Sequence, residues 1–216
     1  MHVHSKHSKE WLVKISQGKE LLWYEGVTQI IGKFAHFLLG KAMPKDWGVY
    51  FRPGMDPFQI YKTCIKRGMD YVTITDHDCM DGIEELLSRK EVDPARVIRG
   101  VEITTHFNNK PIHVLVYELG REDFEEAKKR ANKGVDALVS FLKEEGYYYA
   151  LAHPFLLPWQ TVIRQKITRS EVEELIDMFD VIELNGDFDE ATNELAYRVA
   201  VEKGKRLIAG SDAHIM

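Results

Sequence analysis

Side chains that can bind metal ions directly follow a predicted buried strand, and they constrain the fold more than any other feature of the sequence. The strand covers residues 71–75, which are mostly β-branched or aromatic, and Asp76, His77 and Asp78 come next. Gly68 precedes the strand and is expected to close a helix, because glycine accepts the left-handed conformation found at helix ends. Folds of the α/β class place their chemistry at the carboxyl ends of strands. The segment therefore predicts a functional site at a strand end.

The same pattern recurs along the chain, where further predicted strands contain or precede such residues. The strands cover residues 97–105, 111–117, 147–152, 181–184 and 206–209, and the associated residues are Glu102, His113, His153, Asp212 and His214. Parallel strands end at one edge of a sheet, so residues far apart in sequence can converge there. Alternation of strands with helices implies a parallel sheet, and ligands at many strand ends favour a closed or nearly closed barrel. We therefore expect an α/β fold that carries a metal centre.

A short strand at the start of the chain adds two more imidazoles. His2 and His4 lie two residues apart, which places both side chains on the same face of a strand. Residues 10–55 follow as an aromatic-rich helical insertion, in which the apolar residues from Val27 to Leu38 have helical spacing. Two interpretations of this insertion stay open. It packs against the rest of the domain, or it forms a lid over the metal site.

Helix signals separate the strands. Helices are expected from Asp56-Pro57 to Gly68, from Asp81 to Leu87, from Glu122 to Glu145, from the Ser170–Glu173 capping box to Phe179, and from Asp189 to Gly204. The sequence contains no internal repeat, low-complexity tract or linker. Residues 1–216 are therefore expected to form a single domain.

Composition excludes several classes of protein. The 216 residues suit one domain, and contents of 44% hydrophobic and 29% charged residues are typical of a soluble globular protein. No apolar run approaches the roughly 20 residues that cross a bilayer, and the first residues do not form a signal peptide. A net charge of −5 argues against a general electrostatic grip on nucleic acid. Cys64 and Cys79 do not indicate a disulfide framework, so a cytoplasmic location is the simplest interpretation.

Six segments, taken together and in order, resemble the polymerase and histidinol phosphatase (PHP) superfamily. They are His2-Val3-His4-Ser5, Thr75-Asp76-His77-Asp78, Gly100-Val101-Glu102-Ile103-Thr104, Ile112-His113, Ala152-His153-Pro154 and Gly210-Ser211-Asp212-Ala213-His214. The resemblance implies a distorted seven-stranded (β/α)7 barrel with a two- or three-metal phosphoesterase site. It is strongest toward the small phosphatases and the nucleotide- or RNA-end-processing members. The sequence lacks a glycine-rich phosphate loop, so metal ions and side chains would have to hold a phosphate.

The resemblance also implies roles for individual residues. His2, His4, Glu102 and Asp212 would hold one metal ion; Glu102 would bridge to a second ion completed by His113 with His214 or His153; and His77 would serve a third subsite. Such histidine-rich sites suit Zn²⁺, Mn²⁺ or Fe²⁺ better than Mg²⁺. The nucleophile would be a bridging hydroxide or Asp212, and His153 or His214 would protonate the leaving oxygen. Asp76 and Asp78 would orient His77, or either could itself bind a metal ion.

The sequence departs from the family pattern near the first histidines. Members commonly carry an aspartate or histidine five or six residues after the His-x-His pair, whereas this chain has Lys9 and Glu10, with His7 nearby. Two outcomes stay open: Glu10 or His7 completes the third subsite, or the third metal ion is absent and Lys9 is a fixed positive charge near the substrate phosphate. The chain also starts one residue before His2 and stops two residues after His214, which fits a shortened chain or a piece of a larger protein. His36 and His106 are expected to have no role at the site.

Two functions of different classes follow. The first is a metal-dependent phosphoesterase that acts on a small phosphomonoester, a nucleotide or a short oligonucleotide. The second is a non-catalytic or regulatory barrel that has lost one metal subsite, as Lys9 indicates. Retention of the other ligands favours the enzyme. An amidohydrolase-like activity on a non-phosphate substrate is a third interpretation, weakened because no metal-bound carboxylated lysine is evident.

Overall fold

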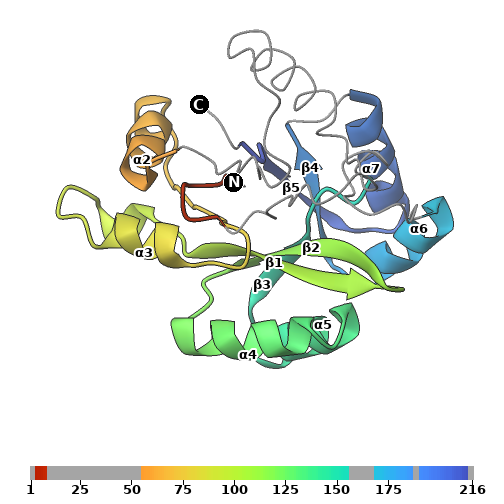
Figure 1. The fold of residues 1–216 in the computed structure, drawn as a ribbon. Coiled ribbons are helices and arrows are strands. Elements are labelled where there is room, and N and C mark those ends of the chain that lie inside the picture. Colours follow the sequence, from red (N-terminus) through yellow and green to blue (C-terminus); the bar gives the residue numbers. More distant parts are fainter. Residues whose placement is uncertain (1–2, 9–54, 156–167, 187–189, 214–216) are drawn as a thin grey trace, which may run out of the picture. The chain divides into compact units, whose positions relative to one another are not determined.

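Five strands and six α-helices make up the part of the chain that the computed structural model describes, which is residues 3–8, 55–155, 168–186 and 190–213. The strands are β1 (Gly100–Phe107), β2 (Lys110–Tyr117), β3 (Tyr148–Leu151), β4 (Val181–Asn185) and β5 (Arg206–Gly210). The helices are α2 (Pro57–Lys66), α3 (Asp81–Leu87), α4 (Arg121–Ala131), α5 (Val135–Glu144), α6 (Arg169–Asp177) and α7 (Glu190–Glu202) (Figure 1). The prediction of a mixed α/β fold is confirmed. A single domain over residues 1–216 stays a prediction.

The five strands form one open sheet in the order β1-β2-β3-β4-β5. The pairs β3–β4 and β4–β5 are parallel as expected, but β1–β2 and β2–β3 are antiparallel. The expectation of an all-parallel sheet is therefore wrong. The cause is the two-residue connection between β1 and β2, in which Asn108 and Asn109 have φ of 50° and 61°. Asparagine tolerates this left-handed conformation, which the tight turns of hairpins require.

Two predicted strands are reduced to isolated bridges. Val72 pairs with Val97 and His77 pairs with Glu102, both in parallel, but residues 71–75 do not form a regular strand. Val3 likewise makes a single parallel bridge, to Ala213. Within the described ranges, the closed seven-stranded barrel expected from the sequence is thus not shown.

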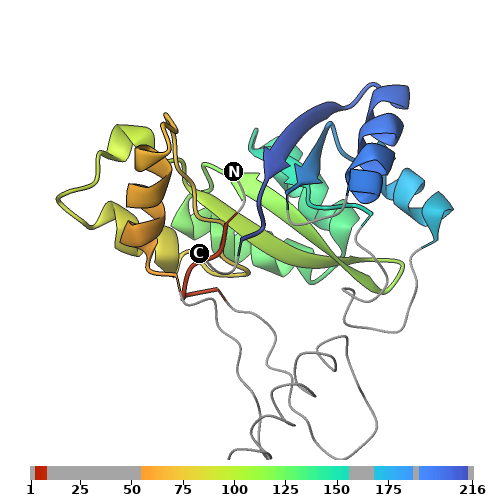
Figure 2. The same cartoon turned by 90° about the horizontal axis from the view of Figure 1, so that it is seen from above.

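Helices cover one face of the sheet. The helices α4 and α5 contact β1, and α7 contacts β4 and β5 (Figures 1 and 2). Side chains alternate across a strand, so one set of residues meets these helices and the other set faces away. The first set belongs to the main hydrophobic core and includes Val101, Ile103, Val114, Leu151 and Ile182. The second set forms a smaller cluster of Leu115, Tyr117, Ala150, Ala152 and Val181.

Local signals explain where the helices begin and end. Asp56 caps α2, because its carboxylate accepts hydrogen bonds from the backbone N–H groups of Phe58 (3.0 Å) and Gln59 (3.2 Å). Gly68 follows the end of this helix with a φ of 81°, as predicted. The single helix expected over residues 122–145 is wrong, because Gly134, with a φ of 115°, separates α4 from α5.

The capping box of α6 is also displaced from its predicted position. Thr168, not Ser170, is the N-cap residue, and its hydroxyl accepts from the backbone N–H of Glu171, whose carboxylate bonds back to the Thr168 N–H. Cys64 and Cys79 are free thiols, as expected. None of the helices in the described part of the chain has the length and apolar character that a membrane crossing requires.

Candidate metal centre

The carboxylate of Glu102 lies at the centre of four imidazole rings. Glu102 is on β1 and is fully buried. Its Oε2 atom lies 3.2 Å from Nε2 of His4 and 3.1 Å from Nδ1 of His77. Its Oε1 atom lies 3.0 Å from Nδ1 of His113 and 3.1 Å from Nε2 of His153. Each oxygen of this one carboxylate therefore faces a different pair of histidines.

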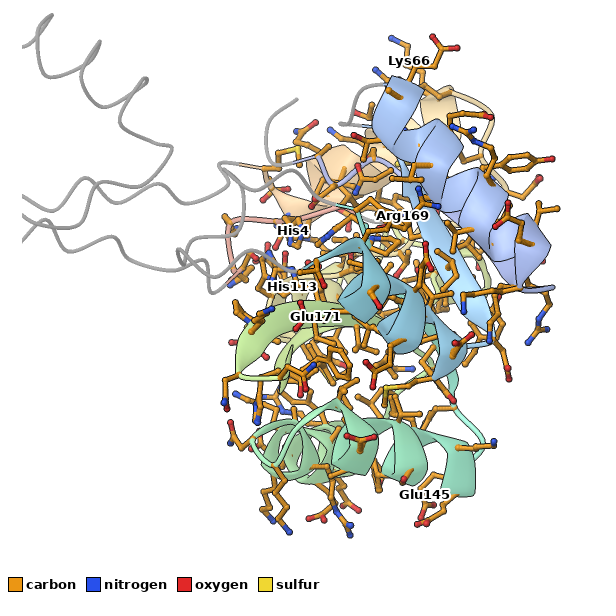
Figure 3. The ribbon with its side chains drawn as sticks, turned by 90° about the vertical axis from the view of Figure 1, so that its right-hand side faces the viewer. His4, Lys66, His113, Glu145, Arg169 and Glu171 are labelled. Carbon is orange, nitrogen blue, oxygen red and sulfur yellow. The ribbon has the colours of Figure 1, made fainter. Side chains whose placement is uncertain are left out.

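Glu102 is shared by two sets of side chains that could each hold a metal ion. We call His4, His77 and Glu102 the His4 group, and Glu102, His113 and His153 the His113 group. The rings of His4 and His77 are stacked, with centroids 4.4 Å apart, and the His77 and His113 rings meet edge to face at 4.7 Å. The two groups are therefore contiguous, and His4 and His113 are close together in Figure 3.

The β1–β2 hairpin positions two of these residues. Its register pairs Glu102 with Leu115 and Thr104 with His113. Residues diagonally opposed in an antiparallel pair lie on the same face of the sheet, within reach of long side chains. The Glu102 carboxylate and the His113 ring meet for this reason, on the face opposite the covering helices.

The start of the chain is held against both edges of the site. The carbonyl of Val3 accepts a hydrogen bond from the Thr75 N–H (2.9 Å), and the His4 N–H donates to the Ala213 carbonyl (3.1 Å). These bonds place His4 between residues 75–77 and the segment that follows β5. Asp212 lies in that segment, and its Oδ1 atom is 3.0 Å from Nε2 of His4.

Asp212 approaches both groups. While Oδ1 contacts His4, Oδ2 lies 3.9 Å from Nε2 of His153 in the His113 group.

Asp212, His153 and Asp78 have positive φ angles of 47°, 27° and 48°. Such conformations are costly for residues other than glycine and persist where the surroundings enforce them, often at functional sites. For His153 the surroundings include Glu183, a buried carboxylate on β4 that accepts from the His153 N–H (3.2 Å).

The electrostatic environment differs between the two groups. Burial holds the pKa of His77 well below its ordinary value, against the pull of Glu102, so its imidazole is neutral and keeps a lone pair. Burial would also lower the pKa of His153, but the hydrogen bond that its ring donates to the Glu102 carboxylate and the charge of Asp212 outweigh burial and raise this pKa. The same negative charges would attract a metal cation.

The spacing of the ligand atoms fits a metal ion. Glu102 Oε1, His113 Nδ1 and His153 Nε2 form a triangle with sides of 3.0, 3.1 and 3.4 Å. A tetrahedral shell with bonds of about 2.0–2.1 Å separates neighbouring ligand atoms by about 3.3 Å. Imidazole nitrogens with a few carboxylate oxygens form a donor set that suits Zn²⁺, Mn²⁺ or Fe²⁺.

The predicted site residues have different outcomes. Those that come together are His4, His77, Glu102, His113, His153 and Asp212. Those outside the described residues are His2, Lys9, Glu10, His36 and His214, together with the proposed lid. His77 lies beside His4 and Glu102, whereas the sequence analysis assigned it to a separate third subsite. His7 contacts Glu85 on α3, with 2.7 Å between Nε2 and Oε2. His106 belongs to neither group.

Several polar residues near the site have hydrogen-bond partners that the sequence did not indicate. Asp76 and Asp78 accept hydrogen bonds from neighbouring segments. Asp76 accepts from the backbone N–H and the hydroxyl of Ser5, and Asp78 accepts from the Thr104 N–H (3.1 Å). Ser8 and Glu183 were not singled out. A lone carboxylate within the apolar strand Val181–Asn185 is a signal that could have identified Glu183, whereas nothing in the sequence distinguishes Ser8 from other serines.

Comparison with known proteins supports the fold. Neither a protein-family profile nor a curated protein sequence matches the chain. Among solved structures, a protein of Bifidobacterium adolescentis, whose assignment as a metal-dependent phosphoesterase is itself a prediction, has a TM-score of 0.55 and 15% identity; the match covers 74% of this chain and 82% of that one. An amidohydrolase from Chromobacterium violaceum, with bound sulfate and no metal, has a TM-score of 0.51 and 15% identity, with coverage of 74% and 83%.

At this level of identity the likeness concerns the fold. A fold shared with a protein assigned by prediction as a metal-dependent phosphoesterase is consistent with the resemblance that the sequence motifs indicate. The neighbours include a protein assigned by prediction as a metal-dependent phosphoesterase and an amidohydrolase, and the chain carries two His/Glu groups that could bind divalent metal ions.

Proposed function

We propose that the protein is a metal-dependent phosphoesterase with two metal ions bridged by Glu102. One observation carries the proposal: the two oxygens of this buried carboxylate each face two imidazole nitrogens at 3.0–3.2 Å. A carboxylate surrounded in this way supports two adjacent cations better than one. A third ion would depend on Glu10 or His7 and stays part of the prediction.

The side chains then divide into roles. His4 and His77 would bind one ion, and His113 and His153 the other, with Asp212 beside both. The bound ions would polarise a phosphoryl group and lower the pKa of a water molecule to about 7. His153 presents Nε2 toward Glu102, which supports a ligand role over proton donation. Proton transfer to the leaving oxygen is therefore assigned to His214, and Asp212 would orient the attacking group.

The proposed architecture is a seven-stranded barrel. Residues 3–4 and 71–77 would act as the two strands that join β5 to β1. The hydrogen bonds between His4 and Ala213, between Thr75 and Val3, and from the Glu102 N–H to the Asp76 carbonyl (3.2 Å) support this arrangement. The inferred substrate is a small phosphomonoester, a nucleotide or a short oligonucleotide. The reduced cysteines agree with the cytoplasmic location in this proposal.

The test begins with metal content. Protein purified without chelator should contain Zn, Mn or Fe at about two equivalents, and chelation followed by dialysis should abolish activity that Zn²⁺, Mn²⁺ or Fe²⁺ then restores. Hydrolysis is screened on phosphomonoesters, nucleotides and short oligonucleotides. Metal binding without turnover of any phosphate ester would favour the regulatory barrel.

A parallel screen addresses a second candidate. Because one structural neighbour is an amidohydrolase, amides and lactams are included in the same assay. Turnover of these compounds with no turnover of phosphate esters would overturn the proposed function while leaving the metal centre in place.

A further inference from the structure

The side chain of Ser8 joins the two histidines of the His4 group. Ser8 is buried, with 3% of its surface exposed. Its Oγ atom accepts a hydrogen bond from the backbone N–H of His77 (2.9 Å) and lies 3.2 Å from Nδ1 of His4. Nδ1 is the ring nitrogen of His4 that points away from Glu102 and Asp212, which both lie near Nε2.

A tight turn fixes the position of this hydroxyl. The Ser8 N–H donates to the Ser5 carbonyl (3.1 Å), closing a turn over residues 5–8. Ser5 anchors the turn to Asp76, and Lys6 and His7 anchor it to Glu85 on α3. Because these bonds hold the turn in place, the fold fixes the position of Ser8 Oγ.

The hydrogen-bonding capacity of serine links this contact to metal binding. A hydroxyl offers one donor and two acceptor lone pairs, and a neutral imidazole carries its proton on only one nitrogen. When Nε2 of His4 keeps a lone pair for a metal ion, Nδ1 carries the proton and donates to Ser8 Oγ, which can accept it together with the His77 N–H. When Nε2 carries the proton, the Ser8 hydroxyl can instead donate to Nδ1.

We propose that Ser8 is a positioning residue that holds the His4 imidazole in its metal-binding orientation and stays hydrogen-bonded to Nδ1 in either tautomer. The inference rests on the proposed metal centre and adds a residue to it. A partner on the second ring nitrogen fixes the orientation of a metal-binding histidine and raises its basicity. In this site the Ser8 hydroxyl also accepts a hydrogen bond from the backbone N–H of His77. One hydroxyl therefore fixes the positions of both His4 and His77.

The test compares Ser8→Ala and Ser8→Thr with the wild type. Metal-stripped protein is titrated with Zn²⁺ and Mn²⁺, and the imidazole ¹⁵N resonance of His4 is recorded with and without Zn²⁺. Ser8→Ala should weaken binding of one equivalent by about 10- to 100-fold and leave the second equivalent little changed. Ser8→Thr keeps the hydroxyl and should restore binding to within about threefold.

The ¹⁵N resonance separates positioning from mere stability. In the wild type, Zn²⁺ should shift His4 fully to the Nδ1–H tautomer, whereas Ser8→Ala should show altered tautomer populations even without metal. Ser5→Ala is the matched control, because it removes a hydroxyl from the same turn that contacts Asp76 and no imidazole. It should lower thermal stability with a smaller effect on metal affinity than Ser8→Ala. If Ser8→Ala does not fold, Ser8→Cys, with its weaker acceptor, takes its place.

The outcomes are distinct. Wild-type affinity and wild-type His4 tautomers in Ser8→Ala would overturn the role of Ser8 while leaving the metal centre intact. Failure of the wild-type protein to bind any of the metals would overturn the proposed function, and with it the role of Ser8 in metal binding. A loss of affinity in Ser8→Ala that Ser8→Thr restores, with the tautomer shift, would support the inference.

Discussion

Oε2 of Glu102 lies 3.1 Å from Nδ1 of His77, while the other oxygen of the same carboxylate faces the His113 group. Two sets of side chains that could bind metal ions therefore share a single carboxylate. Removing its charge should affect both at once, a consequence that no single histidine shares.

Glu102→Gln should abolish turnover and remove at least one equivalent of metal, because an amide oxygen carries no charge to hold two cations together. Metal content by elemental analysis and initial rates provide the measurement. The matched control is Glu84→Gln on α3, which contacts Arg99 at the surface and should keep metal and rate. Full metal content and rate in Glu102→Gln would contradict a bridging role.

The described residues on either side of positions 9–54 lie next to each other. The Lys6 N–H donates to the Met55 carbonyl (2.9 Å), and Nζ of Lys6 lies 3.3 Å from the Asp56 carboxylate. A short linker of about six Gly and Ser residues can therefore replace residues 12–51. We expect the shortened protein to fold and bind metal. Thermal melting and metal content test the first point, and kcat/KM distinguishes the two roles: a lid predicts a loss of activity, simple packing a loss of stability alone.

Gly82 on α3 has no room for a side chain. A Cβ atom there would collide with Oδ2 of Asp76 and the hydroxyl of Ser5. Gly82→Ala should therefore destabilise the protein by about 1–3 kcal/mol and weaken metal binding through the displaced turn at residues 5–8. Gly120→Ala is the control, because its nearest neighbour, Oδ2 of Asp123, lies at an ordinary 3.8 Å. Equal denaturation midpoints for the two variants would refute this packing argument.

Glu85 makes stability depend on pH. The hydrogen bond from His7, with further bonds from Arg89 and Lys6, lowers the pKa of Glu85 to about 2 from an ordinary 4.5. A carboxyl group whose pKa is lowered by folding stabilises the protein above its unfolded value, and this contribution is lost as pH falls through 4.5 toward 2. After allowance for solvent screening it is about 1 kcal/mol.

Glu85→Gln should accordingly lose less stability than the wild type between about pH 5 and pH 2. Urea denaturation at each pH measures the difference. Glu144→Gln, at the exposed end of α5, serves as the control and should follow the wild-type profile. Parallel profiles for Glu85→Gln and the wild type would show that the cluster around Glu85 contributes nothing in this range.

Much of the secondary structure was predictable because its signals are local. Asp56 with Pro57 marked the start of α2, and Gly68 marked the turn after it. The strands of the sheet followed from runs of β-branched and aromatic residues. The antiparallel hairpin was missed because Asn108-Asn109 is a weaker turn signal than Asn-Gly, and because the alternation of helices and strands pointed to a parallel sheet.

The residues that come together at the candidate site were predictable from the sequence, but their arrangement was not. His4, His77 and Glu102 are of residue types that commonly bind metal ions, so the sequence identifies them as candidates. Which of them could share an ion depends on long-range β-bridges, such as that between His77 and Glu102, which no local sequence pattern encodes. Ser8 escaped notice for the same reason, since only the turn over residues 5–8 brings its hydroxyl to His4.

His4 and Asp212 meet although 208 positions separate them in the chain. Bringing such distant residues together costs loop-closure entropy, and contacts of long sequence separation form slowly. The His4 side of the site can therefore be completed only late in folding, once the segment after β5 has joined the sheet. A metal ion bound between these residues would act as a staple across almost the whole chain, slowing unfolding more than it speeds folding.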